Sequence, residues 1–247
     1  MKTEEKTELQ SSRKKGGKRQ TWIALLLIVV VIPATLYLSW RYADRQFYIT
    51  SLLIILYTMI PFFLAFEKQK PQARELVVLA VMCAIAVMSR ALFIWVPHFK
   101  PMTAMIIIAG IAFGAEAGFL VGALSGFVSN FIFGQGPWTP WQMFAYGVAG
   151  FLAGLLYRHG FLSKKRLPLC IFGGAVVILV VGPILDSSSL FTMLSVINPE
   201  SVAAIYLSGL PVNAMHGLAT AVTLLLASGP MFEKLDRIKT KYGMMEE

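Results

Sequence analysis

The chain has 247 residues, of which 57% are hydrophobic and only 14% are charged, and its formal net charge is +9. Soluble domains carry about 25% charged residues, so this composition excludes an ordinary soluble domain and predicts an all-α polytopic membrane protein. The two cysteines, Cys83 and Cys170, both fall in apolar segments. They therefore indicate neither a disulfide framework nor a thiolate metal site, and we expect them to pack inertly.

The N-terminal region begins with a basic stretch, residues 1–21, followed by an apolar run from Trp22 to Trp40. This pattern has the outline of a signal peptide. However, the run is long enough to span a bilayer at about 20 residues, and no small-x-small cleavage site closes it. We therefore predict a cytosolic tail over 1–21 and a two-helix membrane extension over 22–74, whose second helix runs from Phe47 to Phe66.

The charged, proline-containing segment Glu67 to Glu75 separates this extension from a predicted six-helix membrane domain over 75–229, which a cytosolic tail over 230–247 follows. The second of the six is short, because twelve helical residues rise only about 18 Å. It must be tilted, extended or partly re-entrant, or else be fused to the next helix. The six predicted helices are Leu76–Pro97, Met102–Phe113, Ala115–Phe133, Pro140–Tyr157, Leu167–Leu185 and Val202–Ser228.

The distribution of positive charge decides between these alternatives. Eight crossings with a cytosolic N-terminus place 18 of the 22 Lys and Arg residues inside the cell. Fusing the two helices would instead export the basic loop 158–166, against the positive-inside rule. We therefore predict a multi-pass protein of the cell membrane with both termini in the cytoplasm, and its basic charge needs no nucleic-acid partner.

A ladder of glycines at four-residue spacing crosses the middle of this domain. It lies in the stretch Pro101 to Tyr157, whose only charged residue is Glu116. Small residues at this spacing let membrane helices approach each other closely, so the ladder predicts tight helix packing without naming an activity. Its members are Gly110, Gly114, Gly118, Gly122 and Gly126.

Arg90 is the most costly polar group in the predicted spans, because insertion scales assign about 2.5–3.5 kcal/mol to an arginine at a helix centre. Asp186 stands at the outer end of the seventh helix and is a possible partner. A structural ion pair and a ligand-contacting arginine both remain open. Asn213 and His216, three residues apart after Pro211, share a face of the last helix and either bond another helix or line a site.

A second polar cluster flanks the loop GQGPWTPW at the outer side. Tryptophans at a membrane interface are usually belt residues. Two indoles and several amides around one rigid loop also resemble the lining of a site for a flat, polar-edged small molecule. With Arg90, Asn213 and His216, the predicted substrate-binding residues are then Asn130, Gln135, Trp138, Trp141, Gln142 and Tyr146.

Catalytic signatures are mostly absent from the sequence. It has no G-x-x-x-x-G-K-[ST] phosphate loop and no His-Glu-x-x-His motif, so we predict no metal, no cofactor and no catalytic residue. Ser125 and the distant His216 resemble the pair of an intramembrane serine protease, but Ala123 stands where a glycine is expected. An intramembrane hydrolase using these two residues is kept as the alternative function.

Residues from about Glu75 to Gly229 resemble the substrate-binding S components of energy-coupling factor (ECF) vitamin transporters. The resemblance rests on six helices with cytosolic ends, a short second helix after KPMTAM, the glycine-rich helix GAEAGFLVGALSGFVSNFIFG, and the pair Ala80 and Ala84 on the first helix. The two leading helices depart from the usual six-helix pattern.

This resemblance implies a non-enzymatic subunit that captures a vitamin outside the cell and topples in the membrane when bound to a coupling subunit driven by two ATPases. Ala80 and Ala84 would contact the coupling subunit, and the loop Gln135 to Trp141 would close over the vitamin. The fold does not choose the vitamin. The helix-two to helix-three region favours cobalamin or another corrinoid, and a carboxylate vitamin held by Arg90 or Lys100 is the second candidate.

Overall fold

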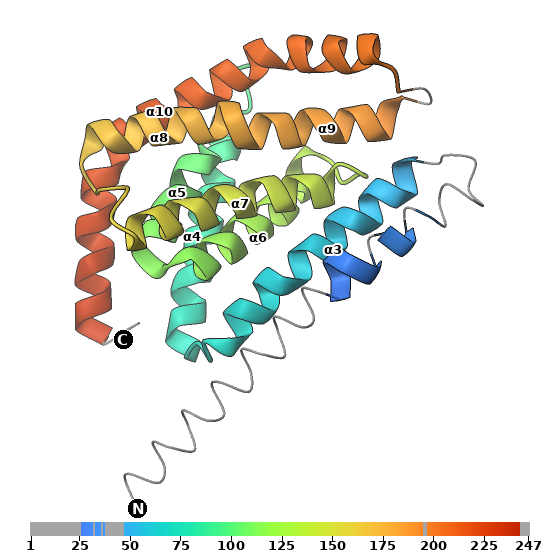
Figure 1. The fold of residues 1–247 in the computed structure, drawn as a ribbon. Coiled ribbons are helices and arrows are strands. Elements are labelled where there is room, and N and C mark those ends of the chain that lie inside the picture. The colour runs from blue at the N-terminus through green and yellow to red at the C-terminus, as the bar shows by residue number, and fades with distance from the viewer. Residues whose placement is uncertain (1–25, 32, 36, 38–46, 195–196, 243–247) are drawn as a thin grey trace, which may run out of the picture. The chain divides into compact units, whose positions relative to one another are not determined.

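A computed structural model describes residues 26–31, 33–35, 37, 47–194 and 197–242. These residues form helices and connecting turns and contain no strand, as Figure 1 shows, which confirms the predicted all-α class. The chain divides into two compact units, Met1–Lys70 and Pro71–Glu247. This division lies close to the predicted boundary between residues 74 and 75.

The first unit contains the helix α3 (Phe47–Lys68), two residues longer than predicted, and the short π-helical segment η1 (Leu27–Val31). Residues Ile49–Lys68 of α3 are long and apolar enough to cross a membrane. The predicted first helix, Trp22 to Trp40, lies largely outside the described residues.

The second unit contains the remaining helices, and two of them, α5 and α6, have the predicted bounds. The 12 residues of α5 are all buried, so this helix is surrounded by protein along its whole length. Burial on every side explains how so short a helix is held in the bundle. The elements are α4 (Ala73–Leu92), α5 (Met102–Phe113), α6 (Ala115–Phe133), α7 (Thr139–Arg158), α8 (Arg166–Val176), η2 (Val177–Val181), α9 (Gly182–Met193) and α10 (Pro199–Tyr242).

Helix α4 ends at Leu92, five residues before the predicted Pro97. Turn hydrogen bonds follow it, from Ile94 N–H to the Ala91 carbonyl at 3.1 Å and from Val96 N–H to the Phe93 carbonyl at 3.1 Å. The pyrrolidine nitrogen of Pro97 cannot donate a helical bond. The resulting α4–α5 loop, residues 93–101, is longer than the sequence pattern predicts.

Helices α8, η2 and α9 form one continuous helix, Arg166–Met193, of 28 residues, whereas the sequence analysis ends it at Leu185. The N–H of Gly182 bonds to the carbonyl of Val177, which makes a π turn directly before Pro183. Such a turn accommodates the missing proline donor and lets the helix continue. At about 1.5 Å per residue it is longer than the bilayer core of about 30 Å.

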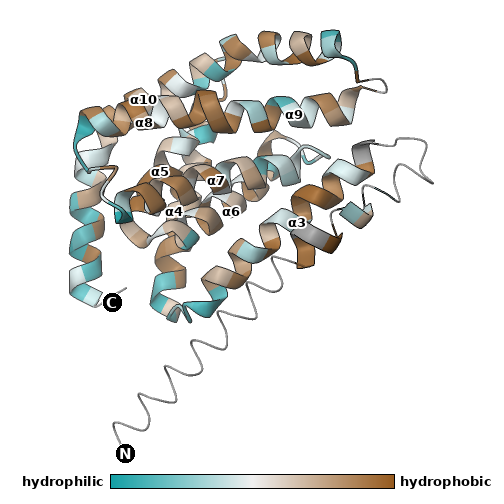
Figure 2. Cartoon of the chain, viewed as in Figure 1, coloured by the Kyte–Doolittle hydropathy of each residue, from teal (hydrophilic) through white to brown (hydrophobic). Residues whose placement is uncertain are grey.

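Helix α10 has 44 residues and continues well past the predicted end at Ser228. It contains Pro211 and Pro230, each of which removes a helical hydrogen bond and bends the axis. Figure 1 shows α10 changing direction along its length. We call residues 230–242 the terminal arm, which is mostly hydrophilic in Figure 2.

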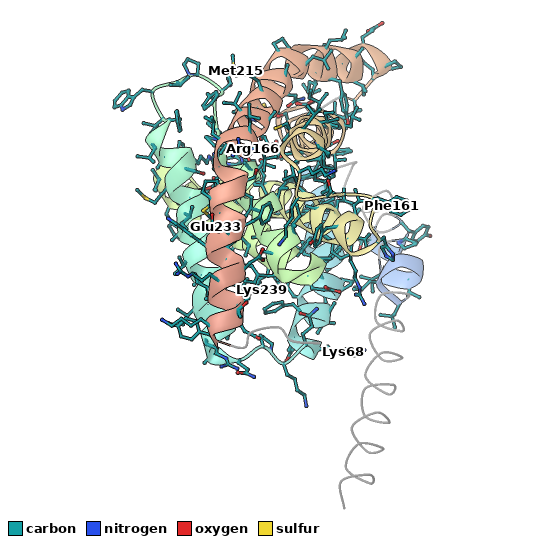
Figure 3. All side chains as sticks on the ribbon, turned by 90° about the vertical axis from the view of Figure 1, so that its left-hand side faces the viewer. Lys68, Phe161, Arg166, Met215, Glu233 and Lys239 are labelled. Atoms are coloured by element: carbon teal, nitrogen blue, oxygen red, sulfur yellow. The ribbon has the colours of Figure 1, made fainter. Side chains whose placement is uncertain are left out.

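The terminal arm is attached to the bundle rather than extending from it as a separate tail. Lys239 Nζ donates to the carbonyl of Ala112 at 2.8 Å, and Lys164 Nζ lies 2.7 Å from Asp236 Oδ2. Phe232 and Leu235 are buried. Figure 3 shows Glu233 and Lys239 on this arm, beyond Arg166.

Glycines join α5, α6 and α7, and we call this contact the glycine seam. A Cβ atom on Gly118 of α6 would lie 2.5 Å from the carbonyl oxygen of Gly150 on α7. Gly110, Gly122 and Gly126 also face α7, which confirms close packing for four members of the predicted ladder. Gly114 differs, because it forms the α5–α6 turn with φ 96° and has open space around it.

Five helices in the described residues are long and apolar enough to cross a membrane, and α5 is a shorter apolar helix. This is therefore a polytopic α-helical membrane protein. The total of eight crossings stays a prediction, because α5 and α7 are not among the five and the first predicted span is largely not described.

Candidate functional site

Arg90 lies near the end of α4 and is only 5% exposed. One of its terminal nitrogens donates to Ser129 Oγ and, at 3.2 Å, to Asn130 Oδ1. Its guanidinium carbon lies 4.2 Å from the centre of the Phe133 ring. All three partners are on the last turns of α6, and all three are neutral.

The predicted pairing of Arg90 with Asp186 does not form in the structure. Asp186 instead accepts a hydrogen bond of 2.8 Å from Asn213 Nδ2, which joins α9 to α10. Asn213 also packs against Gly182. The sequence analysis offered Asp186 as a partner for Arg90, but in the structure α9 and α10 present Asp186 and Asn213 to each other.

The α4–α5 loop and α10 bring three more basic groups near Arg90. Lys100 Nζ lies 5.1 Å from the centre of the same Phe133 ring, and the His98 and His216 ring centres are 6.4 Å apart. Arg90, His98 and Lys100 lie close enough to His216 for their charges to act on it. Burial and the neighbouring Arg90 charge lower the pKa of Lys100.

These four side chains are called the basic cluster here. They come from α4, the α4–α5 loop and α10, and two of them, Arg90 and Lys100, contact the ring of Phe133. His98 has a φ of 57°, a left-handed conformation that histidine adopts more readily than most residues. The cluster comprises Arg90, His98, Lys100 and His216.

The α6–α7 loop is held by its own polar side chains. Thr139 Oγ1 accepts from Asn130 Nδ2 at 3.0 Å and donates to Gln135 Oε1 at 2.9 Å. Gln135 Nε2 donates to the carbonyl of Phe127 at 3.0 Å. The amide of Gln135 thus bonds to both helices that the loop connects, to Phe127 on α6 and to Thr139 at the start of α7. Trp138, 39% exposed, lies over Gly136.

Three predicted residues on α7 follow this loop. Trp141 is 7% exposed and stacks on Phe191 of α9, with ring centres 5.7 Å apart and planes inclined by 21°. Gln142 is half-buried beside it on the same helix. Tyr146 is buried, and its backbone carbonyl faces Gly122 in the glycine seam.

Several polar atoms at this end are buried without any hydrogen-bond partner among the described residues. Leaving such an atom unpaired costs about 1–3 kcal/mol, and folded proteins contain few of them. At this end such atoms occur on four helices, α4, α7, α9 and α10. These atoms are Arg90 Nε, Trp141 Nε1, Gln142 Oε1, Ser188 Oγ and His216 Nε2.

Two other kinds of site receive no support from this geometry. Across the described ranges, no group of three His, Cys, Asp or Glu side chains is arranged to hold a metal ion. Ser125 Oγ and His216 Nε2 form no hydrogen bond with each other in the described part of the chain. The pair required by the hydrolase alternative is therefore not assembled in this structure.

Comparison with known families decides what kind of protein carries this site. A family model described as "ECF-type riboflavin transporter, S component" matches residues 70–230. The chain belongs to this family. The match covers α4 to the start of the terminal arm and leaves α3 outside it. No solved structure matches the chain.

The predicted coupling residues of this S component lie in the middle of α4, on the N-terminal side of Arg90. Ala80 and Ala84 are both exposed there. The sequence analysis did not find the roles of Ser129, Thr139 or Phe191, because each acts through a partner on another helix. His98 was detectable only as a second basic residue beside Lys100 in a mostly apolar segment.

Proposed function

We propose that this S component captures a vitamin-class small molecule at the outer end of the Pro71–Glu247 unit and passes it inward. The observation that carries the proposal is the cluster of buried, unpartnered polar atoms on α4, α7, α9 and α10. A ligand bound there would meet donors from Arg90 and Trp141 and the acceptor of Gln142. The stacked rings of Trp141 and Phe191 supply an apolar wall.

The orientation that we propose puts this site outside the cell and both termini in the cytoplasm. The opposite end of the bundle carries the basic loop 158–166 and the basic terminal arm. The positive-inside rule favours a cytosolic position for both. The substrate would then enter from the outer surface, where the α4–α5 and α6–α7 loops lie.

The driving energy has to come from partner subunits, because the sequence contains no phosphate loop. We propose that a membrane coupling subunit and two ATPases supply it. Ala80 and Ala84 are exposed one turn apart on α4, and small residues let a partner helix approach closely. Ala84→Leu should abolish uptake and copurification of the coupling subunit while ligand binding persists.

A flavin is the first substrate to test, since the family description names riboflavin. The flat face of Trp141 suits a planar heterocycle whose edge atoms bond to Gln142 and the indole N–H. The corrinoid that the sequence analysis favours stays an untested prediction. A carboxylate vitamin is the remaining candidate.

The proposal is tested by identifying the molecule that copurifies with the protein. The full chain is purified in mild detergent from cells grown in rich medium, and absorbance is recorded at the flavin and corrinoid bands. The protein is then denatured and the released molecules are analysed by mass spectrometry. We expect one vitamin at near-stoichiometric amount. Reaction of Ser125 with a serine-hydrolase probe, with no bound vitamin, would instead support the hydrolase alternative.

A further inference from the structure

We propose that the substrate of this site carries an anionic group, a carboxylate or a phosphate, and that Arg90 and Lys100 bind it. The inference rests on the proposed function and specifies the chemical class of the substrate. It follows from the charges around Phe133, which are all positive among the described side chains.

The charge of Arg90 has no counter-charge in the structure. Its hydrogen bonds go to a hydroxyl and an amide oxygen, and among the described residues neither Arg90 nor Lys100 forms an ion pair. A buried charge without an opposite partner is strongly unfavourable. A ligand anion would provide that partner.

A second cation next to the first makes the need for an anion greater. Arg90 and Lys100 both contact the ring of Phe133, at 4.2 Å and 5.1 Å from its centre. Cation–π contacts partly offset desolvation, but they do not remove repulsion between two like charges. The lowered pKa of Lys100 has burial and Arg90 as its causes. An anion between the two side chains would stabilise both charged forms.

The donor arrangement also matches an anion rather than a neutral acceptor. Arg90 Nε–H is buried and unpartnered, and the described structure gives Lys100 Nζ no hydrogen bond. A guanidinium edge and an ammonium together suit the several oxygens of a carboxylate or phosphate. Asp186 bonds to Asn213, and no described acidic side chain forms an ion pair with Arg90 or Lys100. A ligand anion would fill this role.

The remaining unpartnered atoms describe the rest of the ligand. Trp141 Nε1 and Gln142 Oε1 are on α7, whereas Lys100 is in the α4–α5 loop, and they offer one donor and one acceptor. We therefore expect a planar, neutral portion at the Trp141 side and the anionic group at Phe133. If Arg90 and Lys100 had only a structural role, their unpaired donors would be unexplained.

Matched ligand pairs that differ in one charge test the proposal. The full chain, stripped of bound ligand in detergent, is titrated by calorimetry with riboflavin 5′-phosphate against riboflavin, pantothenate against panthenol, and biotin against biotinamide. We expect the acid to bind at least tenfold more tightly than its neutral partner in the pair that the site accepts. The phosphate and carboxylate pairs distinguish the two anions.

Charge-neutral variants then assign the preference to the two cations. Arg90→Gln and Lys100→Gln should each reduce the preference for the acid to less than threefold, because the acid loses more affinity than its neutral partner. Arg158→Gln, at the opposite end of the bundle, removes one positive charge from an exposed position and should change neither. Thermal unfolding of each variant checks that it folds. If Arg90→Gln does not fold, Lys100→Gln alone tests the proposal.

Equal affinity for the two members of the accepted pair, or an acid preference that survives both substitutions, overturns the anionic proposal. Recovery of a neutral vitamin from the purified wild-type protein overturns it as well. In each of these cases the proposed function, capture of a vitamin, is not contradicted. If no vitamin is recovered and no member of any pair binds to the wild-type protein, the proposed function fails together with the inference.

Discussion

The two ends of the Pro71–Glu247 unit differ in whether their polar groups have hydrogen-bond or ion-pair partners. At the end that we propose faces the cytoplasm, called the inner end, Lys164 pairs with Asp236, Lys239 bonds to the Ala112 carbonyl, and Glu75 accepts from the Gln72 N–H. At the opposite, outer end, buried polar atoms from four helices have no partner in the described structure. Ser228 Oγ and Ser125 Oγ, which lie elsewhere in the unit, are also unpartnered, so what distinguishes the outer end is the number of helices that contribute such atoms.

The glycine seam holds together the helices that carry both ends, so a substitution that disrupts it should unfold both. Gly118→Val is expected to destabilise the protein by more than about 3 kcal/mol, because its side chain would collide with the backbone of Gly150. SDS titration in mixed micelles measures the change in unfolding free energy. Gly174→Ala is the control, since its Cβ would meet no atom closer than 3.9 Å. Equal losses in both variants would contradict the specific role of the seam.

A substitution at the outer end should affect binding without affecting stability. Trp141→Phe keeps an aromatic ring against Phe191 but removes the unpartnered indole N–H. We expect about a tenfold loss of ligand affinity, corresponding to one hydrogen bond of about 1.4 kcal/mol. The melting temperature should not change. Trp95→Phe is the matched control, because that indole is 90% exposed in the α4–α5 loop. An unchanged affinity for Trp141→Phe would show that the indole N–H is not used.

Two adjacent serines on α9 allow the sharpest test of paired against unpaired polar groups. Ser188 Oγ is buried and has no partner in the described residues, whereas Ser187 Oγ lies 2.7 Å from Tyr206 Oη and donates to Pro183 at 2.7 Å. Ser188→Ala should leave the unfolding free energy unchanged or raise it by up to about 1 kcal/mol. Ser187→Ala should lower it by about 1 kcal/mol. The same loss in both variants would mean that Ser188 Oγ has a hydrogen-bond partner in the ligand-free protein.

The sequence predicts the two central helices of this unit, α5 and α6, well, because local signals mark their ends. Pro101, Gly114 and Gly134 bracket α5 and α6, and the structure places both helices as predicted. The ends of α4 and α10 were missed. The charged residues of the terminal arm indicated an aqueous tail, and their contacts with α5 and the α7–α8 loop depend on tertiary packing that periodicity does not reveal.

The outer site was predictable in its residue types but not in its pairings. Buried arginine, indole and amide groups stand out in an apolar sequence, and their unpartnered atoms meet at one end of the bundle. Which helix face turns toward which neighbour is set by the whole bundle. For this reason Asp186 was assigned to Arg90 although it bonds to Asn213, and the contribution of His98 was missed.

The smallest effect is expected at the inner end, for the ion pair between Lys164 and Asp236. The Asp236 side chain is 50% exposed, and such surface pairs contribute about 0–1 kcal/mol. Asp236→Asn should therefore lower the unfolding free energy by less than about 1 kcal/mol, and high salt should reduce the difference from wild type. Glu233→Gln, at an exposed position of the same arm, controls for the loss of one negative charge. Ligand affinity should be unchanged in both variants, since neither residue lies near the outer site. A loss of affinity in Asp236→Asn alone would show that the terminal arm is coupled to the outer end, and the two ends would then no longer be independent.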